Sequence, residues 1–117
     1  MTKVIVAGSR DFSNYELLEV EVSLFIADLD NPIIVSGTAR GADRLGEIFA
    51  AKHKLQVERM SADWDTHGRI AGYLRNIEMA KVATHCIVFW DGYSRGTKTM
   101  IDIAKKFKLQ TKVVKYA

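Results

Sequence analysis

The chain has 117 residues, of which 48% are hydrophobic, and it carries 17 Lys and Arg against 14 Asp and Glu. This length and apolar content predict one folded domain over residues 1–117 and exclude a disordered chain. The single cysteine, Cys86, excludes an intramolecular disulfide, and no apolar run reaches membrane-spanning length, so we expect a cytoplasmic protein with no membrane partner. The formal charge of +3 suits an anionic partner without specifying one.

The first half of the chain predicts two strand-helix pairs. Residues 3–7 form a β-branched run typical of a buried strand. Ser13 and Glu16 have the spacing of a capping box, with Phe12 and Leu17 placed as its hydrophobic staple. The helix that follows should bury an apolar stripe consisting of Leu18, Val22, Phe25 and Leu29. Residues 33–35 then predict a second strand, followed by a helical stripe of Ala42, Leu45 and Phe49.

The second half predicts three more strands and two more helices. Residues 56–60 indicate a third strand, and residues 61–68 a loop that carries Trp64 and His67. A third helix should bury Ile70, Leu74, Ile77 and Ala80, and residues 84–90 predict the fourth strand. A last helix should bury Met100, Ile101 and Ala104. Residues 112–116 place charged side chains among apolar ones, which suits a strand at the edge of a sheet.

Alternating strands and helices predict an α/β fold. Right-handed crossovers place a helix between successive parallel strands, so helices should cover both faces of a mainly parallel sheet. The expected architecture is a three-layer Rossmann-like sandwich with about five strands. In such folds ligands bind at the carboxyl edge of the sheet, where the strand order reverses.

Three of the predicted strand-to-helix loops each combine glycine, a hydroxyl group and arginine. They are Gly8-Ser9-Arg10, Ser36-Gly37-Thr38-Ala39-Arg40-Gly41 and Gly92-Tyr93-Ser94-Arg95-Gly96-Thr97-Lys98. Any one of these loops is equally consistent with an ordinary turn. Three of them at one edge of the sheet favour a phosphate site, because glycine lets a phosphate approach the backbone closely and helix N-termini attract anions. None has the spacing of a G-x-G-x-x-G or Walker motif, which disfavours dinucleotide oxidoreductases and P-loop NTPases.

Several segments together resemble one family. These are Gly8-Ser9-Arg10-Asp11, the stretch from Ser36 to Asp43, Ala62-Asp63-Trp64, Arg75-Asn76 with Met79, and Gly96-Thr97. In combination they are similar to the SLOG superfamily, in its YspA-type, cpYpsA-related branch, over essentially the whole chain. The resemblance implies a Rossmann-like domain that binds nucleotides or nucleotide-derived signalling molecules, with relatives in bacterial and phage conflict systems. Such relatives commonly form dimers or larger assemblies, so we expect a homo-oligomer.

The resemblance extends to the LOG phosphoribohydrolases, but with a departure. Their catalytic glutamate follows a glycine-threonine pair that Gly96-Thr97 matches, and the same spacing places Met100 at the glutamate position. Methionine cannot exchange a proton, so hydrolysis by that mechanism is in doubt. The remaining candidates for catalysis are Arg75, which fits an arginine beside the ribose phosphate in those relatives, and the acids Glu78 and Asp91. For Glu78 a solvated helix surface is the preferred interpretation.

The function favoured by these residues is binding or sensing of a small phosphorylated ligand, a nucleotide or nucleotide derivative, with no cofactor required. Two alternatives stay open. One is LOG-like hydrolysis of a nucleoside monophosphate, and the other, less favoured, is DprA-like binding of single-stranded nucleic acid, suggested by the Ser36–Asp43 stretch. We expect no metal site, because the adjacent His85 and Cys86 point to opposite faces of a strand. The predicted ligand-binding residues are Gly8, Ser9, Arg10, Ser36, Gly37, Thr38, Arg40, Gly41, Asp43, Trp64, Arg75, Asn76, Asp91, Gly92, Ser94, Gly96 and Thr97.

Overall fold

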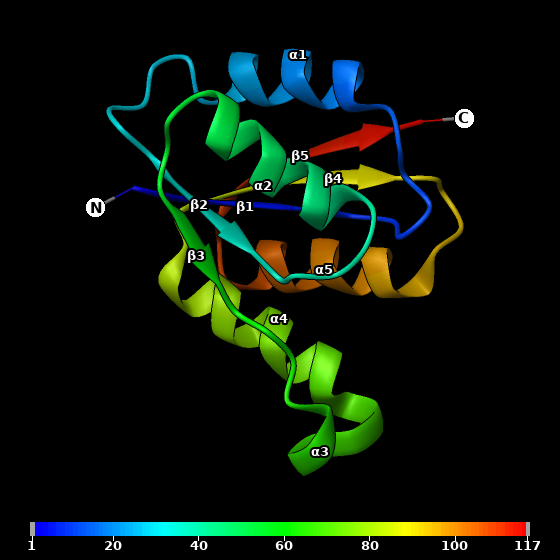
Figure 1. Cartoon of the computed structure of the whole chain (residues 1–117). Helices are drawn as coiled ribbons and strands as arrows, with labels where there is room; N and C mark the ends of the chain where they lie inside the picture. The colour runs from blue at the N-terminus through cyan, green and yellow to red at the C-terminus, as the bar shows by residue number, and fades with distance from the viewer. Residues whose placement is uncertain (1, 117) are drawn as a thin grey trace.

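The computed structural model describes residues 2–116 as a five-stranded, all-parallel sheet covered by helices on both faces (Figure 1). The strand order is β3-β2-β1-β4-β5, which confirms the predicted three-layer Rossmann-like sandwich. The strands are β1 (Lys3–Gly8), β2 (Ile33–Ser36), β3 (Val57–Arg59), β4 (His85–Trp90) and β5 (Gln110–Lys115). Helices α1 (Tyr15–Phe25) and α2 (Ala42–Lys52) cover one face, and α4 (Ala71–Val82) and α5 (Arg95–Lys106) the other.

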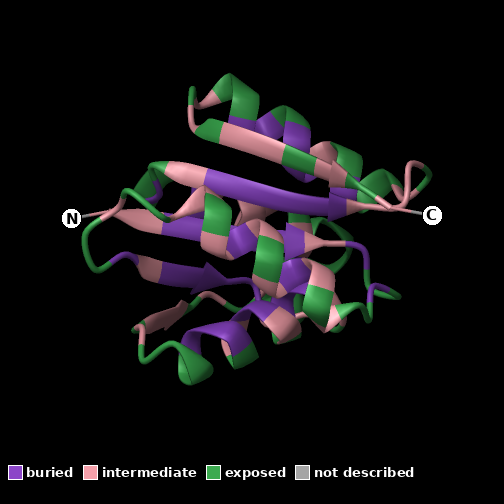
Figure 2. Ribbon diagram, turned by 90° about the horizontal axis from the view of Figure 1, so that it is seen from above, coloured by how far each residue is buried: buried purple, intermediate pink, exposed green. Residues whose placement is uncertain are grey.

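The core lies in two layers because neighbouring strand residues point to opposite faces of the sheet. Ile5, Cys86 and Val88 pack against α4 and α5, whereas Val4, Ile87 and Phe89 pack against α1 and α2. The central strands are therefore buried on both sides (Figure 2), which explains their continuous apolar sequences. The residues of the edge strand β5 are all exposed or partly buried, as expected at the edge of a sheet.

The start of α1 differs from the predicted capping box. The N-cap is Asn14, whose side-chain Oδ1 accepts a hydrogen bond from the backbone N–H of Leu17 at 3.0 Å. The prediction of Ser13 was wrong by one residue, because asparagine caps helices as well as serine does and here has the better position. The helix also ends at Phe25, so Leu29 lies beyond it, although it still packs against the core.

The predicted loop over residues 61–68 is instead partly helical. Asp63 accepts a hydrogen bond from the N–H of Thr66 at 3.2 Å and caps a short helix, α3 (Trp64–His67), followed by a 3₁₀ turn, η1 (Gly68–Ile70). Ile70, which we expected in the core, ends this turn and is 56% exposed. As a result α3 and the beginning of α4 project beyond the sheet (Figure 1).

The strand order reverses between β1 and β4, which are hydrogen-bonded neighbours at the centre of the sheet. From β1 the chain proceeds outward through β2 and β3, and it then crosses through α3 and α4 to return at β4. The loops after β1 and β4 leave toward opposite faces, which opens a crevice at their carboxyl ends. No helix among residues 2–116 combines the length and apolarity needed to cross a membrane.

Candidate functional site

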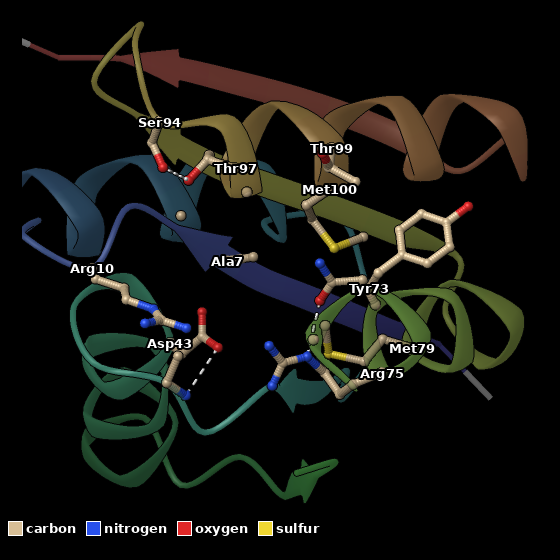
Figure 3. Close-up of a pocket in the computed structure, with 15 residues that line it drawn as sticks. Ala7, Arg10, Asp43, Tyr73, Arg75, Met79, Ser94, Thr97, Thr99 and Met100 are labelled. Atoms are coloured by element: carbon tan, nitrogen blue, oxygen red, sulfur yellow. Dashed lines mark hydrogen bonds between the residues drawn. The ribbon is translucent and has the colours of Figure 1, made fainter. Parts of the chain in front are cut away.

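A first cavity, of about 280 Å³, opens at this reversal of strand order (Figure 3). It lies between the end of β1, the start of α2, helix α4 and the N-terminus of α5. Its lining residues are Ala7, Gly8, Arg10, Ala39, Asp43, Gly72, Tyr73, Arg75, Asn76, Met79, Ser94, Gly96, Thr97, Thr99 and Met100. Arg10, Asp43, Ser94 and Thr97 lie toward one end of the cavity, and Tyr73, Met79 and Met100 toward the other (Figure 3). In this view Arg75 lies between Asp43 and Met79.

A second cavity, of about 460 Å³, adjoins the first. It is formed mainly by the loop after β2 and by the segment between β3 and α3. Its lining residues are Arg10, Gly37, Thr38, Ala39, Arg40, Ser61, Ala62, Trp64 and Arg75. Because Arg10, Ala39 and Arg75 line both cavities, the two spaces are neighbours separated by these side chains.

Most of the predicted ligand-binding residues are brought together at these two cavities. Those that line one or both are Gly8, Arg10, Gly37, Thr38, Arg40, Asp43, Trp64, Arg75, Asn76, Ser94, Gly96 and Thr97. Five others, Ser9, Ser36, Gly41, Asp91 and Gly92, line neither cavity. They lie in the same loops, and the hydrogen bonds described below give several of them a role in holding those loops.

Arg75 connects α4 to the loop after β2. Its Nη1 donates a hydrogen bond to the carbonyl oxygen of Gly37, and its Nε donates to the Asn76 side chain at 2.9 Å. Glycine at position 37 leaves room for these groups, because a Cβ there would lie 2.9 Å from Nη1 of Arg75 and 2.7 Å from Oδ2 of Asp43 and would displace the ends of both side chains. The guanidinium is therefore held in one orientation between the two cavities.

Asp43 brings a buried carboxyl group to the first cavity. The residue is 5% exposed, and its Oδ2 accepts a hydrogen bond from the backbone N–H of Ala39 at 3.2 Å. Burial raises the pKa of Asp43 to about 6, although the Ala39 N–H and the positive charges of Arg75 and Arg10 act in the opposite direction. Asp43 can therefore exchange a proton near neutral pH, which an ordinary exposed aspartate cannot.

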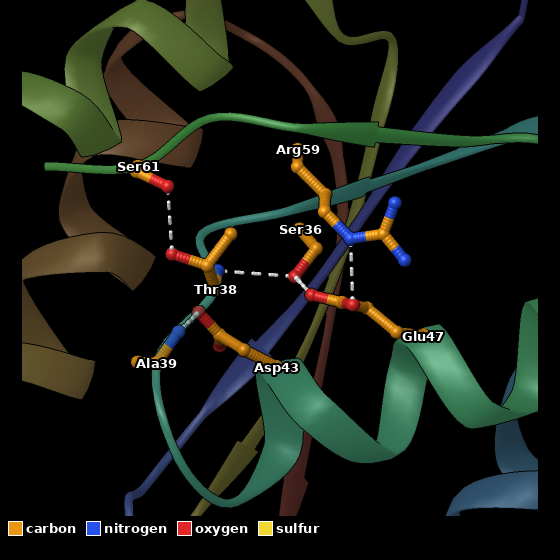
Figure 4. A network of polar contacts seen from close by, with 7 residues as sticks. All are labelled: Ser36, Thr38, Ala39, Asp43, Glu47, Arg59 and Ser61. Carbon is orange, nitrogen blue, oxygen red and sulfur yellow. Dashed lines mark hydrogen bonds and ion pairs between the residues drawn. The ribbon is translucent and has the colours of Figure 1, made fainter.

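Ser36 turns away from both cavities and takes part in a polar network with α2 (Figure 4). Its Oγ donates to Oε2 of Glu47 at 2.7 Å and accepts a hydrogen bond from the N–H of Thr38 at 3.1 Å. The other carboxylate oxygen of Glu47 accepts from Nε of Arg59 at 2.9 Å. Ser36 is completely buried, so its hydroxyl shapes the glycine loop and does not face the space where a ligand would sit.

The loop after β4 is held by Asp91, whose Oδ1 accepts hydrogen bonds from the N–H groups of Tyr93 and Ser94, each at 2.8 Å. These bonds lower the pKa of Asp91, the Ser94 N–H having the larger effect. Thr97, in the first turn of α5, donates from its hydroxyl to Ser94 Oγ at 3.1 Å and lies 3.3 Å from Ser9 Oγ. This turn has no acidic residue of its own, and its residues Gly96 and Thr97 line the first cavity.

Of the three candidates for catalysis, only Arg75 lines a cavity. Glu78 is exposed on α4 and lies 3.3 Å from Nζ of Lys81, and Asp91 is engaged by the turn that follows β4. At the position matching the LOG glutamate, Met100 is 2% exposed and faces the apolar end of the first cavity. Asp43, from the opposite wall, is the one acidic residue that lines either cavity among residues 2–116.

Sequence reasoning missed the apolar end of the first cavity, which is formed by Tyr73, Met79 and Met100 (Figure 3). Met79 and Met100 have the helical spacing of core residues, and no local pattern distinguishes a core methionine from one at a cavity wall. Tyr73 could have been noticed, because it lies two residues before Arg75 and is an aromatic residue on the polar side of a helix; it is 49% exposed.

Fold and site together define the class: a Rossmann-like α/β protein with a cavity at the strand-order reversal, lined by two arginines and by hydroxyl groups at a helix N-terminus.

Within this class the chain belongs to the YspA, cpYpsA-related SLOG family, whose model matches residues 2–67. The chain is also 34% identical over 116 residues to the Gene 61 protein of Mycobacterium phage D29, with 91% of this chain and 90% of that protein covered. No solved structure matches the chain. The family resemblance expected from the glycine loops is therefore confirmed, and it includes the loops after β1 and β2 together with Asp43.

Proposed function

We propose that the protein binds a nucleotide or nucleotide-derived ligand, with a phosphate group beside Arg10, Arg75 and the N-terminus of α5. The observation that carries this proposal is the convergence of two arginine side chains, from different elements, at one cavity (Figure 3). Arginine binds phosphate through a planar, charged fork, and the first turn of α5 offers free N–H groups. A phosphate placed there would be held from two sides.

The opposite end of the cavity suits a nucleobase. Tyr73, Met79 and Met100 offer an aromatic ring and two polarisable thioethers within the same cavity. Such groups stack on or pack against a flat, apolar ring system, and stacking tolerates different bases. The cavity therefore matches a ligand with one charged and one flat apolar end, which is the chemistry of a nucleotide.

The proposal is tested by thermal denaturation with AMP, GMP and inorganic phosphate over a concentration series. Binding to the folded state raises its free energy of unfolding by about 2.7 kcal/mol at a ligand concentration of 100 times Kd. Arg10→Ala and Arg75→Ala should each abolish the shift. Arg44→Ala is the matched control, since Arg44 is an exposed arginine of α2 that lines neither cavity. The absence of any shift with all these compounds would contradict the proposal.

One observation favours hydrolysis as a second candidate function: Asp43 lines the same cavity as Arg75 and has a pKa raised to about 6. A protonated Asp43 could donate its proton to the base of a bound nucleoside monophosphate as the bond from C1′ to the base nitrogen breaks, with the bonding electron pair leaving on the base. Water would add to C1′ and return a proton to the carboxylate. The products are free base and ribose 5-phosphate.

Base release from AMP and GMP, measured by chromatography, tests this candidate. Release that is lost in Asp43→Asn but retained in Glu78→Gln would support it, because Glu78 is an acid outside both cavities. No release at high protein concentration, from a protein that still binds the nucleotide, would leave binding as the function.

A further inference from the structure

The two cavities form one divided space around Arg10 and Arg75. Both side chains line each cavity, and Arg75 is fixed between them by its hydrogen bonds to Gly37 and Asn76. The first cavity alone, at about 280 Å³, lies at the lower limit of pockets that enclose small ligands, which span about 300 to 1,000 Å³. With the second cavity, of about 460 Å³, the space falls well within that range.

Each cavity has its own aromatic side chain. Tyr73 lines the first and is 49% exposed, and Trp64 lines the second and is 52% exposed. Trp64 begins α3 directly after the N-cap Asp63, and its ring lies over α4, where a Cβ on Gly72 would be 3.5 Å from the Trp64 ring. The Trp64 ring is therefore held against α4, and both rings are accessible to a stacking base, each in its own cavity.

The second cavity also has polar groups near its aromatic ring. The hydroxyl groups of Thr38 and Ser61 lie 3.1 Å apart and join the loop after β2 to the segment after β3 (Figure 4). Arg40 lines the same cavity. Hydroxyl groups, an arginine and an accessible indole ring in one cavity provide contacts for a sugar and a base.

We propose that the ligand has two heads: two nucleosides joined through a phosphate bridge, with the bridge at Arg10 and Arg75, one base against Tyr73 and the other against Trp64. This inference rests on the proposed function, because it assigns the phosphate to the same two arginines. It goes further in giving the second cavity a base of its own. A mononucleotide would fill only the first cavity and leave Trp64 without a partner.

The test compares the affinity of diadenosine pyrophosphate with that of ADP by isothermal titration calorimetry. Diguanosine pyrophosphate and GDP are compared in the same way. Both compounds have two phosphates, but the two-headed one has fewer negative charges, so charge alone would make it the weaker ligand. We expect it to bind at least about fivefold more tightly, as expected for one stacked base. A further compound, two adenosines joined 3′ to 5′ by a single phosphate, shows whether the site prefers a bridge of one phosphate or of two.

Variants of the second cavity separate the two heads. Trp64→Ala should reduce the affinity for diadenosine pyrophosphate to that for ADP and leave ADP binding unchanged, and Trp64→Phe should restore the difference. Tyr93→Ala is the control, because Tyr93 is an aromatic residue, 86% exposed, that lines neither cavity. Circular dichroism of each variant checks that α3 and α4 are still folded.

Several results would overturn the inference. Equal affinity for ADP and for every two-headed compound, in both base series, would show that the second cavity takes no base, while the proposed function would stand. Equal losses of both ligands in Trp64→Ala would show that Trp64 supports the fold only. Affinity for oligoadenylates that keeps rising beyond two nucleotides would indicate a nucleic-acid strand. If neither these compounds nor AMP and GMP bind, the proposed function itself fails.

Discussion

The guanidinium of Arg75 donates a hydrogen bond to the carbonyl oxygen of Gly37, 38 residues away in the sequence. This contact links α4, on one face of the sheet, to the glycine loop after β2. It also places a positive charge near the buried carboxyl of Asp43, where it lowers the pKa that burial raises. Because Arg75 lines both cavities, their geometry depends on this contact.

Arg75→Lys should weaken both ligand binding and the fold. Lysine retains the positive charge but cannot donate to Gly37 and Asn76 together, because it lacks the planar fork of arginine. We expect the free energy of unfolding to fall by about 1 to 3 kcal/mol, the usual effect of losing a hydrogen bond that involves a charged group. Urea denaturation measures this loss. Stability equal to that of the wild type would show that the Arg75–Gly37 contact contributes little.

Gly37→Ala should perturb the site by pushing its neighbours apart. The new Cβ would lie 2.7 Å from Oδ2 of Asp43 and 2.9 Å from Nη1 of Arg75, closer than packed atoms tolerate. Because these atoms are the ends of side chains beside a cavity and can move, we expect a loss in urea denaturation at or below the lower end of the range of about 1 to 3 kcal/mol for overpacking a filled interior.

Gly96→Ala is the matched control for that substitution. No atom lies within 4 Å of a Cβ at Gly96, and the residue is in the first turn of α5. Alanine should leave the stability unchanged or raise it, by at most about 1 kcal/mol, because alanine favours the helix. Comparable losses in the two variants would show that the close packing around Gly37 is not the cause.

Asp43 should make stability depend on pH. Burial raises its pKa to about 6 in the folded state, whereas an unfolded aspartate titrates near its model value of 3.8. The folded state therefore binds the proton more tightly, so the stability associated with this group is fully present below about pH 4 and is lost as the pH rises through about 6. The difference in pKa corresponds to at most about 3 kcal/mol.

Asp43→Asn isolates this contribution, since asparagine does not titrate but can still accept a hydrogen bond from Ala39. Urea denaturation of both proteins at several pH values from 4 to 7.5 should show the wild type losing stability relative to the variant as the pH rises. Other titrating groups are common to both proteins and cancel. Parallel stability curves over this range would contradict the raised pKa.

Glu47 should hold the glycine loop through Ser36. Glu47→Ala removes the acceptor for a completely buried hydroxyl group and also the partner of Arg59. An unsatisfied buried polar group costs about 1 to 3 kcal/mol, and urea denaturation should show a loss of that size. Glu47→Gln retains an acceptor for Ser36 and should lose less. Equal losses in the two variants would indicate that the charge of Glu47 matters more than the bond to Ser36.

The sequence by itself determined the architecture. The β-branched run of β1 and the helical stripe of Leu18 and Val22 are local patterns, and the structure buries them as those patterns require. The same is true of the placement of the glycine loops after β1, β2 and β4, because parallel strands bring their carboxyl ends to one edge. Periodicity and turn chemistry act within a few residues, so they can be read without knowing the rest of the chain.

Only the tertiary structure decided what each polar side chain faces. Nothing near Ser36 in sequence predicts that its hydroxyl is taken by Glu47, and nothing near Asp43 predicts that it is buried beside a cavity. The path of α3 and α4 beyond the sheet sets where Arg75, Tyr73 and Trp64 lie. These contacts join residues far apart in the chain. Their physical basis is the packing of helices on the sheet, which local sequence patterns do not encode.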